Sequence, residues 1–132
     1  MSILNRIVKW NEERGLIEKG FNHKVEMAHI IEELMESTGK EDSLSAREMA
    51  EKRAEEILNG NENQNKEEIV DAFADIIVFA TGAIAKLGYD PEKVMDEVLK
   101  EIESRTGKMI DGKFVKDPSP KMYKANFSKC LK

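Results

Sequence analysis

The sequence predicts an all-α protein, a bundle of four to five helices followed by a basic, mostly non-helical C-terminal tail. Apolar residues recur at helical spacing through five stretches, and each stretch has its own start or stop signal. Proline disrupts helix interiors and occurs only at positions 91, 118 and 120, so the long stretches are free to be helical. One stretch, residues 69–87, is apolar around nearly its whole circumference, which predicts a buried helix.

The first three expected helices have recognisable ends. They cover residues 3–14, 22–37 and 43–58, and the third is amphipathic and rich in Glu, Lys and Arg. Ser, Asp and Asn cap helix N-termini because their side chains accept hydrogen bonds from unpaired backbone N–H groups. Glycine ends helices because it readily adopts left-handed backbone geometry. The expected caps and stops are Asn22, Ser43 or Ser45, Gly15 and Gly39.

A polar linker separates these helices from two more. Residues 59–66, NGNENQNK, are expected to form a flexible loop. The fourth helix then continues to Leu87 and stops at Gly88. Asp90 and Pro91 predict the start of the fifth helix, with Asp as the cap and Pro in the first turn. The expected inner face of that helix consists of Val94, Val98, Leu99 and Ile102.

The helical pattern ends after Thr106. Residues 108–115, KMIDGKFV, place Asp-Gly between short apolar pairs, which predicts a small hairpin. Tyr123, Phe127 and Leu131 recur at four-residue spacing and are expected to pin the tail to a neighbouring surface.

Length and composition narrow the class of protein. A chain of 132 residues can bury one core, expected in a helical domain over residues 1–106, with the tail over 107–132 packed on it or on a neighbouring subunit. Cys130 is the only cysteine, which excludes an internal disulfide and fits a cytoplasmic setting. The longest apolar run, residues 76–85, is too short to span a bilayer, so we expect no membrane partner.

The net charge of −5 conceals an asymmetry. Residues 107–132 carry seven lysines and two aspartates, a charge of +5, which leaves −10 on the preceding residues. An acidic body repels phosphate, which argues against duplex nucleic acid as the main partner. The pattern fits a small polyphosphate ligand, with carboxylates holding a metal and tail lysines holding phosphate oxygens.

Three acidic side chains share one narrow sector of the apolar fourth helix. Glu68, Asp71 and Asp75 interrupt a run that otherwise avoids polar atoms. Carboxylates in a buried helix are costly unless they are paired, hydrogen-bonded or bound to a cation. Lys86, the only basic residue of residues 69–87, lies about three turns from Asp75 at ~5.4 Å per turn. A salt-bridge partner would therefore have to come from another helix.

The second expected helix has an acidic face of its own. Four side chains fall within roughly a quarter turn of each other, opposite a broad apolar side: Glu26, His29, Glu33 and Glu36. Antiparallel packing would bring Glu33 and Glu36 against the two aspartates of the fourth helix. Four converging carboxylates form an oxygen cage for a hard divalent cation, which Mg²⁺ suits best. The alternative for the glutamates is a solvated helix face.

Two acidic motifs roughly thirty residues apart resemble a family signature. The first is Glu32-Glu33-Leu34-Met35-Glu36, and the second runs from Glu68 to Asp75. Together they resemble the EExxE and ExxD motifs of the all-α nucleoside triphosphate pyrophosphohydrolases, which include MazG-like, phosphoribosyl-ATP pyrophosphohydrolase-like and dimeric dUTPase-like enzymes. The segment Leu87-Gly88-Tyr89-Asp90 and the basic tail resemble the phosphoribosyl-ATP branch. The similarity covers most of the chain from Asn22 onward.

The resemblance implies a Mg²⁺-dependent catalytic domain, with Mn²⁺ as the alternative metal, that hydrolyses a nucleoside triphosphate or related nucleotide to the monophosphate and pyrophosphate. Glu32 or Glu68 would orient or deprotonate the attacking water. The implied metal ligands are Glu33, Glu36, Asp71 and Asp75. The implied phosphate contacts are Arg105, Lys108, Lys113 and Lys116. Family members are typically dimers or dimers of dimers, so we expect a homodimer or homotetramer.

One position departs from the family pattern. Three residues before Asp75 stands Ala72, where many members have glutamate, whereas a literal ExxD runs from Glu68 to Asp71. Both registers lie on the same face of the helix, so the ligand set of the fourth helix stays open between them.

Two other functions compete with this one. Glu26 and His29 form a Glu-x-x-His pair, the unit of ferritin-like di-iron bundles, but that architecture needs two such units and His23 lacks the preceding glutamate. The second alternative is a helical bundle that has lost catalysis and serves as a binding module.

Overall fold

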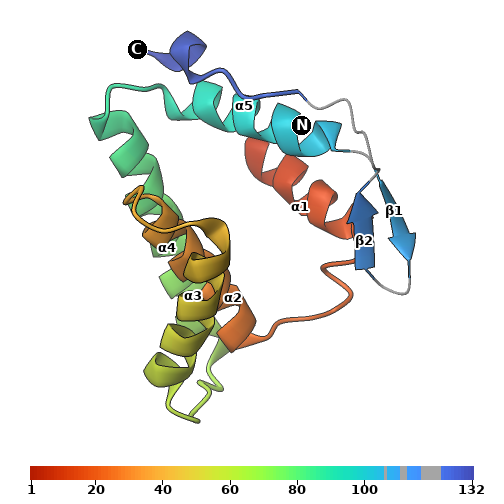
Figure 1. Cartoon of the computed structure of the whole chain (residues 1–132), viewed down its shortest axis with the longest axis vertical. Helices are drawn as coiled ribbons and strands as arrows, with labels where there is room; N and C mark the ends of the chain where they lie inside the picture. Colours follow the sequence, from red (N-terminus) through yellow and green to blue (C-terminus); the bar gives the residue numbers. More distant parts are fainter. Residues whose placement is uncertain (106, 111–112, 117–122) are drawn as a thin grey trace. The chain divides into compact units, whose positions relative to one another are not determined.

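The computed structural model describes residues 1–105, 107–110, 113–116 and 123–132, and only the backbone of the two strands (Figure 1). The chain divides into two compact units. One consists of residues 1–19 and 70–132, and the other of residues 20–69. Each unit is described by itself below.

Helices dominate the described residues, so the prediction of an all-α protein is confirmed. The helices are α1 (Ile3–Glu13), α2 (His23–Glu36), α3 (Ser43–Leu58), α4 (Lys66–Lys86) and α5 (Pro91–Ser104). They are followed by strands β1 (Gly107–Ile110) and β2 (Lys113–Lys116) and by a 3₁₀ turn, η1 (Phe127–Cys130).

The N-terminal caps set where the helices begin. As predicted, Asn22 accepts a hydrogen bond from the backbone N–H of Val25 at 3.2 Å, and Asp90 caps α5. The prediction for α3 was wrong by one position: Asp42, not Ser43 or Ser45, caps the helix by accepting from the Ser45 N–H at 2.8 Å. A carboxylate is favoured there because it also interacts with the positive end of the helix dipole.

Small residues let α2 and α3 pack closely within the unit of residues 20–69. Ala46, Ala50 and Ala54 recur every four residues along α3 and are 0% exposed. Ala28 of α2 packs against this stripe, with Met27 and Ile31 beside it. Burial of alanine costs little side-chain entropy, so the small apolar area buried between α2 and α3 still stabilises their packing.

Two ion pairs define the direction of α3 relative to α2. Lys24, near the start of α2, lies 2.9 Å from Glu55 near the end of α3. Glu32, one to two turns before the end of α2, lies 3.4 Å from Arg47 in the first turns of α3. The two helices therefore run antiparallel, and the four side chains border one edge of their contact.

In the other unit, α1 packs on α5 through polar and aromatic contacts. Arg6 bridges Asp96 at 2.8 Å and Glu103 at 2.6 Å, both on α5. The indole N–H of Trp10 donates to the carbonyl of Ile102, and the Arg14 guanidinium stacks 4.3 Å from the centre of the Trp10 ring. These contacts hold the two helices side by side, as Figure 1 shows.

The final residues of the chain are held on α5 by a buried carboxylate. Glu97 is 5% exposed and accepts hydrogen bonds from the Tyr123 hydroxyl and, at 2.9 Å, from the backbone N–H of Asn126. The Tyr123 N–H donates to the Ser104 hydroxyl at 2.8 Å. Buried Cys130 continues the contact through its carbonyl, which accepts from the Asp90 N–H at 2.7 Å.

The anchoring side chains of the tail differ in part from those predicted. Phe127 and Leu131 are exposed, whereas Tyr123 is half-buried and Cys130 is buried. Four-residue spacing identified an apolar pattern, but the tail is extended or 3₁₀ here rather than α-helical, so that spacing does not define one face.

The predicted hairpin is confirmed in its strands. β1 and β2 are antiparallel, with Gly107 opposite Lys116 and Ile110 opposite Lys113. The Asp-Gly turn at positions 111–112 lies outside the described residues.

Helix α4 differs most from expectation. The apolar circumference predicted a buried helix, yet no residue of α4 is buried in the single chain. Phe79, for example, is 76% exposed. Among the described residues, no helix is long and apolar enough to cross a membrane.

Replacing Glu97 by Gln should lower the thermal midpoint by several degrees at neutral pH and flatten its fall in acid. The Tyr123 hydroxyl, and after it the Asn126 N–H, lower the pKa of Glu97 by stabilising its charged form. Such a group stabilises the fold above its unfolded pKa, about 4.3, and this stabilisation is lost as pH falls through the lower folded value. Thermal unfolding between pH 3 and 7 measures the effect.

Glu48→Gln, at an exposed glutamate of α3, is the matched control for that change. It should reproduce the wild-type midpoints across the series. Identical pH profiles for Glu97→Gln and wild type would show that Glu97 does not hold the tail.

Candidate active site

The EExxE glutamates lie along one side of α2. Glu33 and Glu36 are one helical turn apart, and Glu32 precedes them on the side that packs towards α3. The position of Ala28 against α3 turns Glu33 away from the packed stripe, so its side chain is open to solvent. Glu33 and Glu36 lie on the face that periodicity predicts to be polar, whereas Glu32 lies at its edge, in contact with Arg47 of α3.

The electrostatics of Glu33 are those of a clustered acid. Neighbouring protein atoms keep some water away from its carboxylate, and repulsion from Glu36 and then Glu32 adds to this effect. Both causes raise the pKa of Glu33, while the nearby His29 lowers it. A group of oxygen ligands that repel one another fits a hard divalent cation, which would relieve the repulsion.

The second set of acidic residues lies on α4. Asn65 begins this helix by accepting hydrogen bonds from the backbone N–H groups of Glu67 at 3.1 Å and Glu68 at 3.3 Å. Glu68, Asp71 and Asp75 are exposed and follow one another at spacings of three and four residues. Both registers of the ExxD pattern therefore share one face, and the backbone does not distinguish them.

The two acidic sets fall in different units. Glu32, Glu33, Glu36 and Glu68 belong to residues 20–69, whereas Asp71 and Asp75 belong to the other unit. Among the described residues of the single chain, no three His, Cys, Asp or Glu side chains form a group that could hold a metal ion. Each helix thus carries part of the predicted ligand set.

A cavity of about 290 Å³ lies along the contact of α2 with α3. Glu32 and His29 line it from α2, and Arg47 and Glu51 line it from α3. Its remaining lining residues are Lys24, Val25 and Ala28. The EExxE motif thus borders a cavity that also contains cationic groups.

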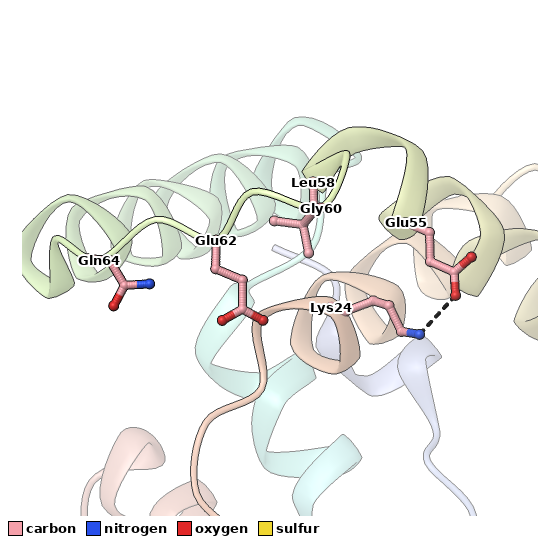
Figure 2. Close-up of a pocket in the computed structure, with 6 residues that line it drawn as sticks. All are labelled: Lys24, Glu55, Leu58, Gly60, Glu62 and Gln64. Carbon is pink, nitrogen blue, oxygen red and sulfur yellow. Dashed lines mark hydrogen bonds and ion pairs between the residues drawn. The ribbon is translucent and has the colours of Figure 1, made fainter.

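A second cavity of about 480 Å³ adjoins the same edge of the helix pair (Figure 2). Lys24 lines both cavities and forms its ion pair with Glu55 here. The linker contributes Glu62 and Gln64, whose side chains are drawn along the loop in Figure 2, and the remaining lining residues are Leu58 and Gly60. The two cavities therefore meet at Lys24.

The predicted phosphate contacts are only partly described. Arg105, directly after α5, lies 3.7 Å from Glu101, and its buried Nε has no hydrogen-bond partner among the described residues. Lys108 lies on β1 and Lys113 and Lys116 on β2. The side chains of these lysines lie outside the described part of the chain.

Sequence reasoning missed Arg47 and Glu51 as residues near the motif. They are four residues apart and therefore on one face of α3, a signal the sequence does contain. The missing information was the register of α3 against α2, which depends on the alanine stripe and the short connection at 37–42. Without that register, the charges of α3 indicate only a solvated face.

A family comparison shows which family the chain belongs to. Residues 26–101 match the sequence model of a family described as phosphoribosyl-ATP pyrophosphohydrolase. The match covers more than half of the chain and includes both acidic motifs. The chain belongs to the phosphoribosyl-ATP pyrophosphohydrolase family. The predicted superfamily is confirmed.

Membership of the phosphoribosyl-ATP pyrophosphohydrolase family also settles the class of reaction. The protein is a nucleotide pyrophosphohydrolase, a hydrolase acting on phosphoric anhydride bonds, and hydrolases of this family are generally divalent-metal dependent. Comparison with curated proteins and with solved structures gave no match.

Proposed function

We propose that the protein hydrolyses a nucleoside triphosphate, or a related nucleotide such as phosphoribosyl-ATP, to the monophosphate and pyrophosphate in a Mg²⁺-dependent reaction. Mn²⁺ is the alternative metal. The observation that carries the proposal is the family match, which includes the EExxE glutamates of α2 and the acidic stripe of α4. The environment of Glu33 adds physical support: partial burial, and after it repulsion from Glu36 and Glu32, raise its pKa, and a bound cation would relieve that repulsion.

The ligand set proposed for the metal is Glu33, Glu36, Asp71 and Asp75. A divalent cation held there would neutralise phosphate oxygens and lower the pKa of a bound water. In the reaction, the water oxygen forms a bond to the α-phosphorus while the bond from that phosphorus to the pyrophosphate oxygen breaks. The carboxylates contribute mainly by positioning and by fixed negative charge around the metal.

Glu32 and Glu68 are the proposed groups that orient or deprotonate the attacking water. Glu32 is largely enclosed and contacts Arg47, whereas Glu68 is exposed in the first turn of α4. A base has to reach the water through a hydrogen bond, so whichever carboxylate faces the α-phosphorus takes this role.

Glu33→Gln and Asp75→Asn should each lower kcat for nucleotide hydrolysis by about 100-fold or more, since each change removes a charged oxygen ligand without changing shape. Pyrophosphate release with Mg²⁺ measures the loss, and circular dichroism checks the fold. Comparison of Glu68→Gln with Asp75→Asn decides the register of the second motif, because Asp71 belongs to both registers.

Glu56→Gln, at an exposed glutamate of α3 that pairs with Arg53, controls for loss of one negative charge. It should retain wild-type kcat. Wild-type activity of Glu33→Gln or Asp75→Asn at saturating Mg²⁺ would exclude that residue from the ligand set.

We further propose a homodimer or homotetramer in which a second copy covers α4. Large apolar side chains of this helix are exposed in the single chain, among them Val70, Ile77, Val78 and Phe79. Monomeric proteins rarely expose contiguous apolar surface of this kind. A second copy of the chain carries an identical apolar helix, so two copies can cover each other.

Light scattering at micromolar concentration should give the mass of two or four chains of 15.0 kDa each. Phe79→Ser should shift the protein towards the single-chain mass, because it removes the most exposed apolar side chain of α4. Leu44→Ser, at an exposed leucine of α3, is the matched control and should not change the mass. A wild-type mass of one chain would contradict the proposal.

The basic hairpin is the proposed phosphate-binding part of the tail, together with Arg105. It lies between Arg105 and Tyr123, and the hydrogen bond from the Tyr123 N–H to Ser104 closes the base of this loop. Its lysines stand on a segment of charge +5 in an otherwise acidic chain, so Coulomb attraction favours contact with a metal-bound polyphosphate.

Replacing Lys108, Lys113 and Lys116 together by Gln should raise KM about tenfold and weaken its dependence on salt. Steady-state kinetics between low and high ionic strength measure both effects. The matched control replaces three exposed lysines, Lys93, Lys124 and Lys132, and therefore makes the same change in net charge. Equal kinetics for the two triple variants would exclude a specific role for the hairpin.

A further inference from the structure

Arg47 of α3 lies against the first glutamate of the EExxE motif. Its Nε is 3.4 Å from Oε1 of Glu32. The Glu32 side chain is 15% exposed and the Arg47 side chain 65% exposed, so the arginine occupies the open edge of the α2–α3 cavity. The position is defined within one unit, residues 20–69.

This contact places a guanidinium beside the metal-binding half of α2. Glu33 follows Glu32 directly, and Glu36 lies one turn further along the same side, about 5–6 Å away between Cβ atoms. Within the described part of the chain, no other lysine or arginine forms an ion pair with an EExxE glutamate. A phosphate bound beside Glu32 at this cavity would therefore meet the Arg47 guanidinium.

The guanidinium retains donors for a ligand. Its contact with Glu32 uses Nε, and its terminal nitrogens form no hydrogen bond within the described part of the chain. Arginine donates in a planar fork that matches two phosphate oxygens, which makes it better suited to phosphate than to a single carboxylate oxygen. Lys24, the other cation of the cavity, is already hydrogen-bonded to Glu55 at 2.9 Å.

We propose that Arg47 binds a phosphate group of the nucleotide substrate at this edge of the cavity, and that Glu32 positions the guanidinium for it. The inference rests on the proposed function and adds a substrate contact from α3 to the acidic site. It assigns Glu32 to positioning and leaves Glu68 as the group that acts on water.

A purely structural role for the Arg47–Glu32 pair is the competing explanation. Exposed ion pairs contribute little to stability, and α2 and α3 are already held together by the buried alanine stripe. A structural pair would affect the unfolding temperature but not the affinity for phosphate compounds. The affinity for phosphate compounds therefore distinguishes the two explanations.

Calorimetric titration of the full chain with pyrophosphate in Mg²⁺ tests the contact directly. Arg47→Met should bind pyrophosphate about tenfold or more weakly than wild type, because a charge-assisted hydrogen bond is lost. Arg47→Lys should recover part of the affinity, since it restores the charge but not the fork. In nucleotide hydrolysis, Arg47→Met should raise KM more than it lowers kcat.

Arg53→Met is the matched control on the same helix. Arg53 is exposed, pairs with Glu56 at 2.9 Å and lines neither cavity. Its replacement should leave pyrophosphate affinity and KM unchanged. Thermal unfolding of each variant separates loss of binding from loss of fold. Equal pyrophosphate affinity for folded Arg47→Met and wild type would overturn the proposal.

Glu32→Gln tests the positioning role. The amide lacks the charge that pairs with Arg47 and cannot accept a proton at neutral pH, so positioning predicts a raised KM with kcat within about threefold of wild type. A loss of kcat of about 100-fold at unchanged KM would instead make Glu32 the base and overturn the assignment.

Failure of the proposed function gives a different result. A wild-type protein that hydrolyses no nucleotide in Mg²⁺ or Mn²⁺ would reject the function, whereas the phosphate contact is judged by pyrophosphate titration alone. The contact between Arg47 and phosphate is rejected if wild type and Arg47→Met bind pyrophosphate with equal affinity. It is also rejected if neither protein binds pyrophosphate.

Discussion

The close packing of α2 on α3 is the constraint on which the candidate site depends. Three fully enclosed alanines of α3 allow the helices to approach closely, and the approach sets which polar side chains meet at the edge. Lys24 meets Glu55 and Glu32 meets Arg47 because the helices are antiparallel in this register. A shift of one residue along α3 would rotate Arg47 away from the EExxE motif by about 100°.

A second constraint is that the negative charges of the EExxE glutamates need groups of opposite charge nearby. The pKa of Glu33 is raised first by partial burial of its carboxylate and then by repulsion from Glu36 and Glu32. Glu32 has a partner of opposite charge in Arg47. Among the described residues, no lysine or arginine forms an ion pair with Glu33 or Glu36, and a cation of the kind proposed above would neutralise their charge.

The tail shows how a single buried carboxylate can order a polar segment. Glu97 accepts from a side chain and a backbone group of the segment after residue 122, and Glu101 accepts from the Ala125 N–H at 3.0 Å. These bonds lower the pKa of Glu97, so folding and its ionisation are coupled. They also fix one end of the basic loop, whose other end is the C-terminus of α5.

Local patterns in the sequence determined the helices, the strands of the hairpin, most caps and the polar face of α2, because caps, turns and periodicity depend on neighbouring residues. Contacts between elements that are distant in the sequence were found only in the tertiary structure. Glu97, Arg47 and the exposed state of α4 depend on which elements meet, and periodicity does not encode this. An apolar circumference predicts that the surface of a helix is buried, but the residues that bury it can belong to the same chain or to another copy.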